Sequence, residues 1–99
     1  MKIYNIVFKN DAKKDLKDFS NNQQILIAKQ LKKISMSPEL GKVLGNKNGY
    51  NLSGCQKMYA DNKKIRIVYR VIDDKIIIEV IAIGKRDDME VYDKASKRV

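Results

Sequence analysis

The chain has 99 residues and carries 21 lysines and arginines against 12 aspartates and glutamates, a formal net charge of +9 at pH 7. This length predicts a single domain over residues 1–99, and the charge favours nucleic acid, an acidic protein or an anionic membrane surface as partner. No apolar run approaches the roughly 20 residues of a membrane-spanning helix, so we expect no membrane insertion and a cytoplasmic location. Histidine is absent and Cys55 is the single cysteine, which excludes histidine-based acid–base catalysis, a disulfide framework and a multi-cysteine zinc site. We expect neither a metal ion nor a small-molecule cofactor.

The first part of the chain predicts a strand and two helices. Lys2–Phe8 is rich in β-forming residues, Asn10 is expected to cap a first helix, and residues 20–22 are expected to end that helix and cap a second. Apolar residues recur at helical spacing, as Ala12, Leu16 and Phe19 in the first helix and Ile27, Leu31 and Ile34 in the second. Ser37-Pro38 ends the second helix. The short break between the helices predicts an antiparallel helical hairpin.

Between Pro38 and about Asn51 the composition turns to glycine and asparagine. This composition predicts a loop over the surface. Its expected apolar anchors are Leu40, Val43 and Leu44.

The second half is rich in β-forming residues and predicts three strands, Leu52–Ala60, Lys64–Ile72 and Lys75–Ile83. The last two would form a tight hairpin with a two-residue loop that places Ile72 opposite Lys75. One hairpin face is then apolar and must cover the helices, with the pairs Val71–Ile76, Tyr69–Ile78, Ile67–Val80 and Ile65–Ala82. The other face is mixed and carries Lys64, Arg66, Val68, Arg70, Ile77, Glu79 and Ile81.

A final short helix is expected from about Asp87 to Lys97. Its acidic start and basic end suit the helix dipole, and Val91 and Ala95 would pack it on the sheet. The sequence therefore predicts an α+β fold, in which an N-terminal strand and a helical hairpin pack on a small, mainly antiparallel sheet with a short C-terminal helix.

Cations and one tyrosine could converge at one end of this sheet. Arg66 lies mid-sheet on the mixed face, and Arg86 and Tyr92 lie just past the end of the neighbouring strand. Nearby lysines add to this set, namely Lys57, Lys63, Lys64 and Lys85.

Such a set suits the cleavage of RNA without metal or histidine, because the 2′-hydroxyl of RNA can itself attack the adjacent phosphorus. Fixed cations that stabilise the phosphoryl oxygens could contribute roughly 3–4 kcal/mol per well-placed donor. A positioned proton acceptor could add about 10²–10⁴-fold. A tyrosine such as Tyr92 has a free pKa of about 10 and needs neighbouring cations to stabilise its phenolate.

Other polar residues have structural explanations. Arg70 is expected to pair with Glu79 across the hairpin, Tyr69 to lie in the core and Cys55 to pack as a small hydrophobic residue. The helix lysines are expected to be solvated, namely Lys13, Lys14, Lys17, Lys32 and Lys33. Three further tyrosines could stack on RNA bases, although packing is the commoner use, namely Tyr4, Tyr50 and Tyr59.

Four segments carry a family resemblance. They are Leu52-Ser53-Gly54, Arg66-Ile67-Val68-Tyr69-Arg70-Val71-Ile72-Asp73, Val80-Ile81-Ala82-Ile83-Gly84-Lys85-Arg86 and Glu90-Val91-Tyr92, with Ala95 and Arg98 behind them. Together they resemble the RelE/ParE superfamily of bacterial toxins, the RelE branch above all, and the resemblance extends over nearly the whole chain. It implies the fold described above, ribosome-dependent cleavage of mRNA in the decoding site, and silencing by a cognate antitoxin.

The resemblance also implies roles for individual residues. Arg66 and Arg86 match the sheet and post-strand arginines of the family, and they would hold and stabilise the scissile phosphate. Tyr92 matches the C-terminal tyrosine of the family and would orient or deprotonate the 2′-hydroxyl.

One departure concerns lysines. RelE-type toxins place two alternating lysines on the strand before the sheet arginine. Here the corresponding stretch, residues 59–64, is shorter and ends in two adjacent lysines. Lys64 is the candidate for the assisting role, and Lys57 or Lys63 could also supply the charge. Lys57, Lys63 and Lys85 are expected to bind mRNA or ribosomal RNA.

Two alternatives stay open. One is a non-enzymatic ParE-like toxin that binds and poisons DNA gyrase, and the other is an inactive member that only binds its antitoxin or nucleic acid. The joint presence of Arg66, Arg86 and Tyr92 favours cleavage, because a gyrase-binding toxin would not need the three together.

Overall fold

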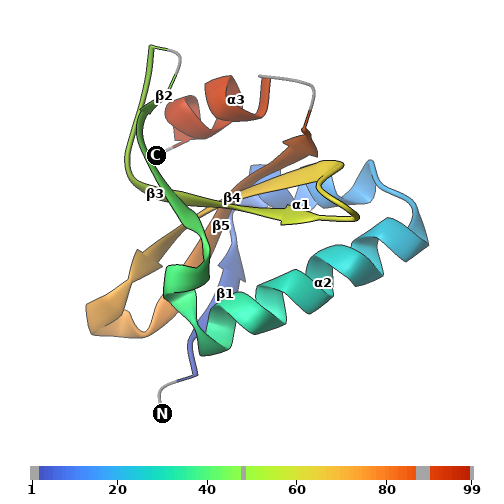
Figure 1. Cartoon of the computed structure of the whole chain (residues 1–99), viewed down its shortest axis with the longest axis horizontal. Coiled ribbons are helices and arrows are strands. Elements are labelled where there is room, and N and C mark those ends of the chain that lie inside the picture. The colour runs from blue at the N-terminus through green and yellow to red at the C-terminus, as the bar shows by residue number, and fades with distance from the viewer. Residues whose placement is uncertain (1–2, 48, 87–89, 99) are drawn as a thin grey trace.

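The computed structural model describes residues 3–47, 49–86 and 90–98, which form a five-stranded sheet and three α-helices (Figure 1). In chain order the elements are β1 (Asn5–Phe8), α1 (Asn10–Lys17), α2 (Asn21–Met36), the 3₁₀ helix η1 (Pro38–Leu40), β2 (Lys42–Lys47), β3 (Tyr50–Ala60), β4 (Ile65–Ile72), the 3₁₀ helix η2 (Asp73–Lys75), β5 (Ile77–Lys85) and α3 (Glu90–Arg98). The predicted strand start at Lys2 and helix start at Asp87 lie outside the described residues. In the described part of the chain, no helix is long and apolar enough to cross a membrane.

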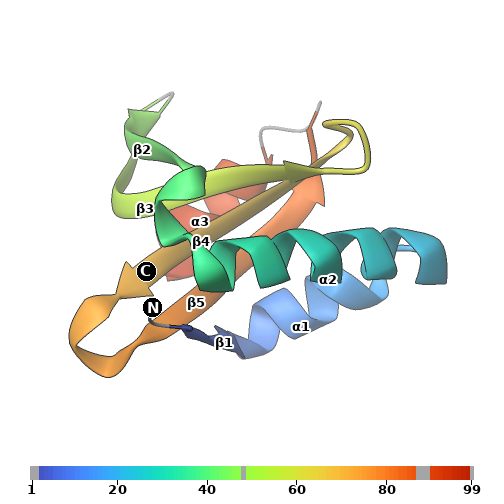
Figure 2. The ribbon, with the colours of Figure 1, turned by 60° about the horizontal axis from the view of Figure 1, so that its bottom comes forward.

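The sheet has the strand order β1-β5-β4-β3-β2. β1 runs parallel to β5, and every other neighbouring pair is antiparallel. α1 and α2 cover one face of the sheet and α3 lies on the other (Figures 1 and 2). This arrangement confirms the predicted α+β class with a mainly antiparallel sheet.

The two N-terminal helices begin in different ways. Ser20 caps α2 in a capping box, in which its hydroxyl accepts the N–H of Gln23 and the Gln23 side chain accepts the N–H of Ser20. The prediction that Asn10 caps α1 is wrong. Lys9 holds the capping position in an extended conformation, because its N–H still bonds to the Val80 carbonyl of β5 and α1 follows the strand directly.

Each face of the sheet has its own apolar core. The first lies under α1 and α2 and contains Ala12, Ile27, Leu31, Ile34, Ala60, Ile65, Ile67, Tyr69, Ile78, Val80 and Ile83. The second lies under α3 and contains Leu52, Cys55, Val68, Ile81, Ala82, Val91, Tyr92 and Ala95. Because each large apolar side chain contributes about 1.5–3 kcal/mol when fully buried, both cores are needed to stabilise so short a chain.

The prediction of a surface loop from residue 38 to 51 is wrong. β2 pairs with β3 in this region, and the glycines that indicated a loop have positive φ angles within the hairpin, 60° at Gly45 beside a β-bulge and 81° at Gly49 in the turn. Leu40 and Val43 are 53% and 71% exposed, so they do not anchor the segment. Leu44 does, since it packs against the second core.

The predicted register of the β4–β5 hairpin is also wrong. Ile72 pairs with Ile77 rather than Lys75, because η2 and a left-handed Ile76 (φ 54°) replace the two-residue turn. A bulge between Val68 and Tyr69 then changes the side of the sheet to which the later residues of β5 point. Ala82 consequently lies in the second core instead of facing the helical hairpin.

Candidate functional site

The pairing of β3, β4 and β5 places several candidate residues at one end of the sheet. Tyr59 of β3 pairs with Arg66 of β4, and Arg66 pairs in turn with Gly84 of β5. Arg86 follows directly after β5. Residues from three separate parts of the sequence therefore meet next to Tyr59.

Three cations surround the ring of Tyr59. Lys57 Nζ donates a hydrogen bond to the Tyr59 hydroxyl over 2.9 Å and lies 5.0 Å from the ring centroid. The guanidinium carbons of Arg66 and Arg86 each lie 5.8 Å from the same centroid. We call Lys57, Tyr59, Arg66, Arg86 and Tyr92 the Tyr59 cluster. Cations at these distances are attracted to the ring face and would also attract an RNA phosphate.

Arg66 and Tyr92 form the buried part of the cluster. Arg66 is 7% exposed, and its guanidinium carbon lies 4.5 Å from the ring centroid of Tyr92. Tyr92 is fully buried, and its hydroxyl makes no hydrogen bond to the described residues. Gly84 permits this packing, because a Cβ at that position would lie 2.9 Å from Val91 Cβ and would separate α3 from the sheet.

The cluster changes the acidity of Tyr59. The hydrogen bond from Lys57, assisted by Arg66 and by the charges of both side chains, lowers the pKa of Tyr59 from 10.0 to about 8, against the opposing effect of partial burial. A phenolate is therefore far more accessible at neutral pH on Tyr59 than on a free tyrosine.

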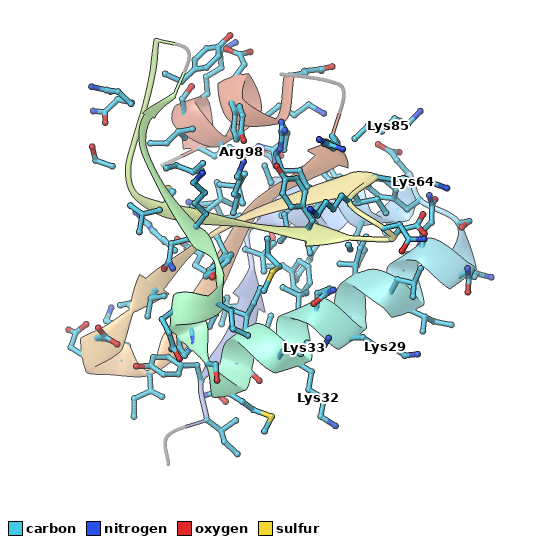
Figure 3. The ribbon with its side chains drawn as sticks, viewed as in Figure 1. Lys29, Lys32, Lys33, Lys64, Lys85 and Arg98 are labelled. Carbon is cyan, nitrogen blue, oxygen red and sulfur yellow. The ribbon has the colours of Figure 1, made fainter. Side chains whose placement is uncertain are left out.

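A hollow of about 550 Å³ adjoins the cluster, and Arg86 belongs to both. Three of its lining residues are exposed lysines: Lys63 and Lys85, which the sequence predicted to bind RNA, and Lys64, which it predicted to assist catalysis. The Arg86 N–H bonds to the Lys64 carbonyl over 2.9 Å, which ties the β3–β4 turn to the end of β5. Figure 3 shows Lys64 and Lys85 together at this end of the molecule. Phe19 supplies an aromatic side chain to the wall.

The predicted residues thus divide between two neighbouring places. Four predicted residues lie together, namely Lys57, Arg66, Arg86 and Tyr92, whereas Lys64 lies in the hollow. The lysine that lies beside the arginines of the cluster is therefore Lys57 rather than Lys64. The alternate position on that strand holds Tyr59, which sequence reasoning did not assign to the site. The signal was its spacing of two from Lys57, which puts both side chains on one face of β3.

The structural explanations for other polar residues are confirmed. Arg70 bonds to Glu79 over 2.6 Å. Tyr69 is fully buried, and burial raises its pKa to about 12. Cys55 is also buried, which raises the pKa of its thiol and disfavours the nucleophilic thiolate.

Comparison with known proteins places this chain in a family. The family model for the ParE toxin of type II toxin–antitoxin system, parDE, matches residues 6–90. The chain is 32% identical over 98 residues to the mRNA interferase toxin RelE of Escherichia coli strain K12, with 97% of each chain covered. The chain therefore belongs to the RelE/ParE superfamily of toxins.

Two solved structures that it resembles are of the E. coli toxin RelE. A mutant of the E. coli toxin RelE in the free state has a TM-score of 0.80 and 30% sequence identity, with 98% of each chain covered. The same toxin in complex with a peptide of the antitoxin RelBc has a TM-score of 0.70 and 29% identity, again with 98% of each chain covered.

Proposed function

We propose that this chain is a RelE-like toxin that cuts mRNA on the ribosome without a metal ion. The observation that carries the proposal is the convergence of Lys57, Arg66 and Arg86 around Tyr59. The cations could bind the scissile phosphate and stabilise the charge that develops on its oxygens. The name of the E. coli relative, an mRNA interferase, supports the same reaction.

The residues of the cluster suit different parts of this reaction. Arg86 is exposed and could contact the phosphate directly, while Arg66 lies deeper and would add its charge from below. Tyr92 keeps its predicted role as the group that orients or deprotonates the 2′-hydroxyl only if α3 moves and exposes its hydroxyl. The lysines of the hollow, Lys63, Lys64 and Lys85, would hold the flanking RNA.

The proposed partners follow from the same relatives. The RelE complex with an antitoxin peptide supports an antitoxin protein as the partner that silences this chain. Ribosomal RNA and mRNA would be its nucleic-acid partners, and the cytoplasm would be the place of action because translation occurs there.

The test is induced expression of the wild-type toxin and Arg86→Ala, followed by primer extension on cellular mRNA. We expect the wild type to arrest growth and produce discrete mRNA cuts. Arg86→Ala should reduce cutting by about 10²–10³-fold, since it removes one charge-stabilising donor. Lys75→Ala is the matched control, because it removes an exposed cation at the β4–β5 turn, the opposite end of the hairpin.

Growth arrest without mRNA cuts, accompanied by a DNA-damage response, would reject cleavage in favour of the gyrase-binding alternative. Equal loss of cutting in Arg86→Ala and Lys75→Ala would show that net charge, rather than the cluster, supports the activity.

A further inference from the structure

The two tyrosines of the cluster differ in their access to solvent. Tyr59 is partly exposed, and its hydroxyl accepts a hydrogen bond from Lys57, which is also partly exposed. Tyr92 is fully buried on the side of α3 that packs against the sheet, and its hydroxyl makes no hydrogen bond within the described ranges. A group that takes a proton from RNA must reach it within hydrogen-bond distance. Tyr59 can do so without any movement of α3.

We propose that Tyr59 is the group that removes the proton from the attacking 2′-hydroxyl, an inference that rests on the RNA cleavage proposed above. The 2′ O–H bond breaks and its proton moves to the Tyr59 phenolate, while the 2′-oxygen forms a bond to phosphorus. The bond from phosphorus to the 5′-oxygen breaks, its electron pair stays on that oxygen, and the oxygen takes a proton from water. The Tyr59 proton then neutralises the hydroxide formed. The products are a 2′,3′-cyclic phosphate and a 5′-hydroxyl.

The charges around Tyr59 favour this role in two ways. Lys57 faces it from β3, Arg66 from β4 and Arg86 from the segment after β5, and Tyr92 of α3 contacts the same Arg66. These cations stabilise the phenolate before the reaction. They would also bind the phosphate beside it, so that the 2′-hydroxyl and its proton acceptor are brought together by the same groups.

The lowered pKa makes the phenolate available at neutral pH. With a pKa of about 8, roughly a tenth of Tyr59 is phenolate at pH 7, against roughly a thousandth for a tyrosine with the ordinary pKa of about 10. Because the phenolate is the reactive form, the cleavage rate should rise with pH and level off above about pH 8. The hundredfold gain in phenolate outweighs its weaker basicity, since a base is most effective when its pKa lies near the working pH.

The experiment measures single-turnover cleavage of mRNA on programmed ribosomes, with the toxin at saturating concentration, as a function of pH. Tyr59→Phe should lower the maximal rate by about 10²–10⁴-fold and remove the rise towards alkaline pH, while the half-saturating toxin concentration stays the same. Tyr50→Phe is the matched control. Tyr50 lies on the same strand but packs against the second core, so this variant should cleave as the wild type does.

A second measurement follows the ionisation of Tyr59 itself, by ultraviolet titration of the tyrosines without RNA or ribosomes. The wild type should show one tyrosine that titrates near pH 8, and Tyr59→Phe should lack it. Lys57→Gln should move this titration and the midpoint of the cleavage profile to higher pH together, because it removes the charge but leaves a hydrogen-bond donor.

The outcomes separate the two proposals. Equal rates and pH profiles for the wild type and Tyr59→Phe would overturn the role of Tyr59 and leave mRNA cleavage intact. Loss of the alkaline rise in Tyr92→Phe instead of Tyr59→Phe would also overturn it. If the wild type cuts no ribosome-bound mRNA at any pH although Tyr59 titrates near pH 8, the proposed function itself fails.

Discussion

Gly41 shows how a single residue determines the path of the chain between α2 and β2. Its N–H donates to the Tyr69 hydroxyl over 2.9 Å, and that hydroxyl donates to the Pro38 carbonyl over 2.9 Å. A Cβ at position 41 would lie 2.0 Å from the same hydroxyl oxygen, which is the end of a fully buried ring. The absence of a side chain at Gly41 thus allows a buried phenol to bond to both sides of the connection.

We expect Gly41→Ala to lower the free energy of unfolding by roughly 2–4 kcal/mol, because it combines overpacking with the loss of buried hydrogen bonds. Urea unfolding followed by circular dichroism measures this. Tyr69→Phe removes the hydroxyl alone and leaves the Gly41 N–H without its partner, so it should cost about 1–3 kcal/mol. If Gly41→Ala costs no more than a typical surface substitution, the close contact is not present in solution.

Tyr69 also makes stability depend on alkaline pH. Its pKa is raised from 10.0 in the unfolded chain to about 12 in the folded protein, chiefly by burial. A raised pKa means that the stability from this group is fully present below pH 10 and is lost as the pH rises through about 12. We expect the wild type to lose stability over this range and Tyr69→Phe to lose less, as measured by thermal unfolding at a series of pH values.

At the scale of elements, Asp15 connects α1, β5 and α3. Its buried carboxylate accepts hydrogen bonds from the Ile83 N–H over 3.1 Å and from Arg98 Nη1 over 2.7 Å. Arg98 also donates to the Ile81 carbonyl over 2.9 Å. Figure 3 shows Arg98 beneath α3. The last turn of the C-terminal helix is thereby held to the sheet by charge as well as by its apolar face.

Asp15→Ala should lower the free energy of unfolding by about 3–5 kcal/mol, because it removes the close carboxylate partner of the largely buried Arg98 guanidinium and leaves the buried Ile83 N–H without its acceptor. The remaining ion pair of Arg98 among the described residues, with Asp11, is longer at 3.8 Å. The amides of α3 should lose protection in hydrogen exchange before those of β4. Asp93→Ala is the control on α3 itself, since its partner Lys97 is 75% exposed and i,i+4 pairs of this kind contribute only about 0.3–0.5 kcal/mol. Similar losses of stability in the two variants would contradict the connecting role of Asp15.

Elements that carry their own local signal could be predicted from the sequence. α2 has a capping box at Ser20 and an apolar stripe, and the strands on either side of η2 are dense in β-branched residues. The β2–β3 hairpin and the β4–β5 register could not be predicted, because they depend on positive φ angles at Gly45 and Ile76 and on a bulge near Tyr69. Such conformations are selected by tertiary packing and leave little trace in residue types.

The residues of the candidate site likewise differ in whether they could be predicted from the sequence. Arg66 and Arg86 could be identified by type and by their place relative to the strands. For Tyr59 the sequence offered only a spacing of two from Lys57, because its chemistry also comes from neighbours on β4 and after β5 and depends on the register that pairs it with Arg66. The burial of Tyr92 is likewise a property of the packed helix, since nothing in its immediate sequence distinguishes it from an exposed tyrosine.

At the scale of the whole molecule, the positive charge is distributed over separate surfaces. One group of exposed lysines lines the hollow beside Arg86, and another runs along α2, namely Lys29, Lys32 and Lys33 (Figure 3). Long-range attraction of RNA depends on the total of +9, whereas stable binding depends on the phosphates that particular side chains neutralise. Long-range attraction and direct phosphate binding can be separated, because removing the same number of lysine charges from either group lowers the net charge equally.

Two triple variants are compared. One neutralises the hollow by Lys63→Gln, Lys64→Gln and Lys85→Gln, and the other neutralises α2 by Lys29→Gln, Lys32→Gln and Lys33→Gln. We expect the hollow variant to bind a single-stranded RNA oligonucleotide more weakly than the α2 variant. If each lysine of the hollow neutralises one phosphate, the slope of log affinity against log salt should become shallower by about 2, since single strands contribute about 0.7 per contact. The α2 variant should keep the wild-type slope and lose only association rate. Fluorescence anisotropy over a range of salt concentrations measures the slope. Equal changes in both triple variants would mean that RNA is held by the overall field rather than by the hollow.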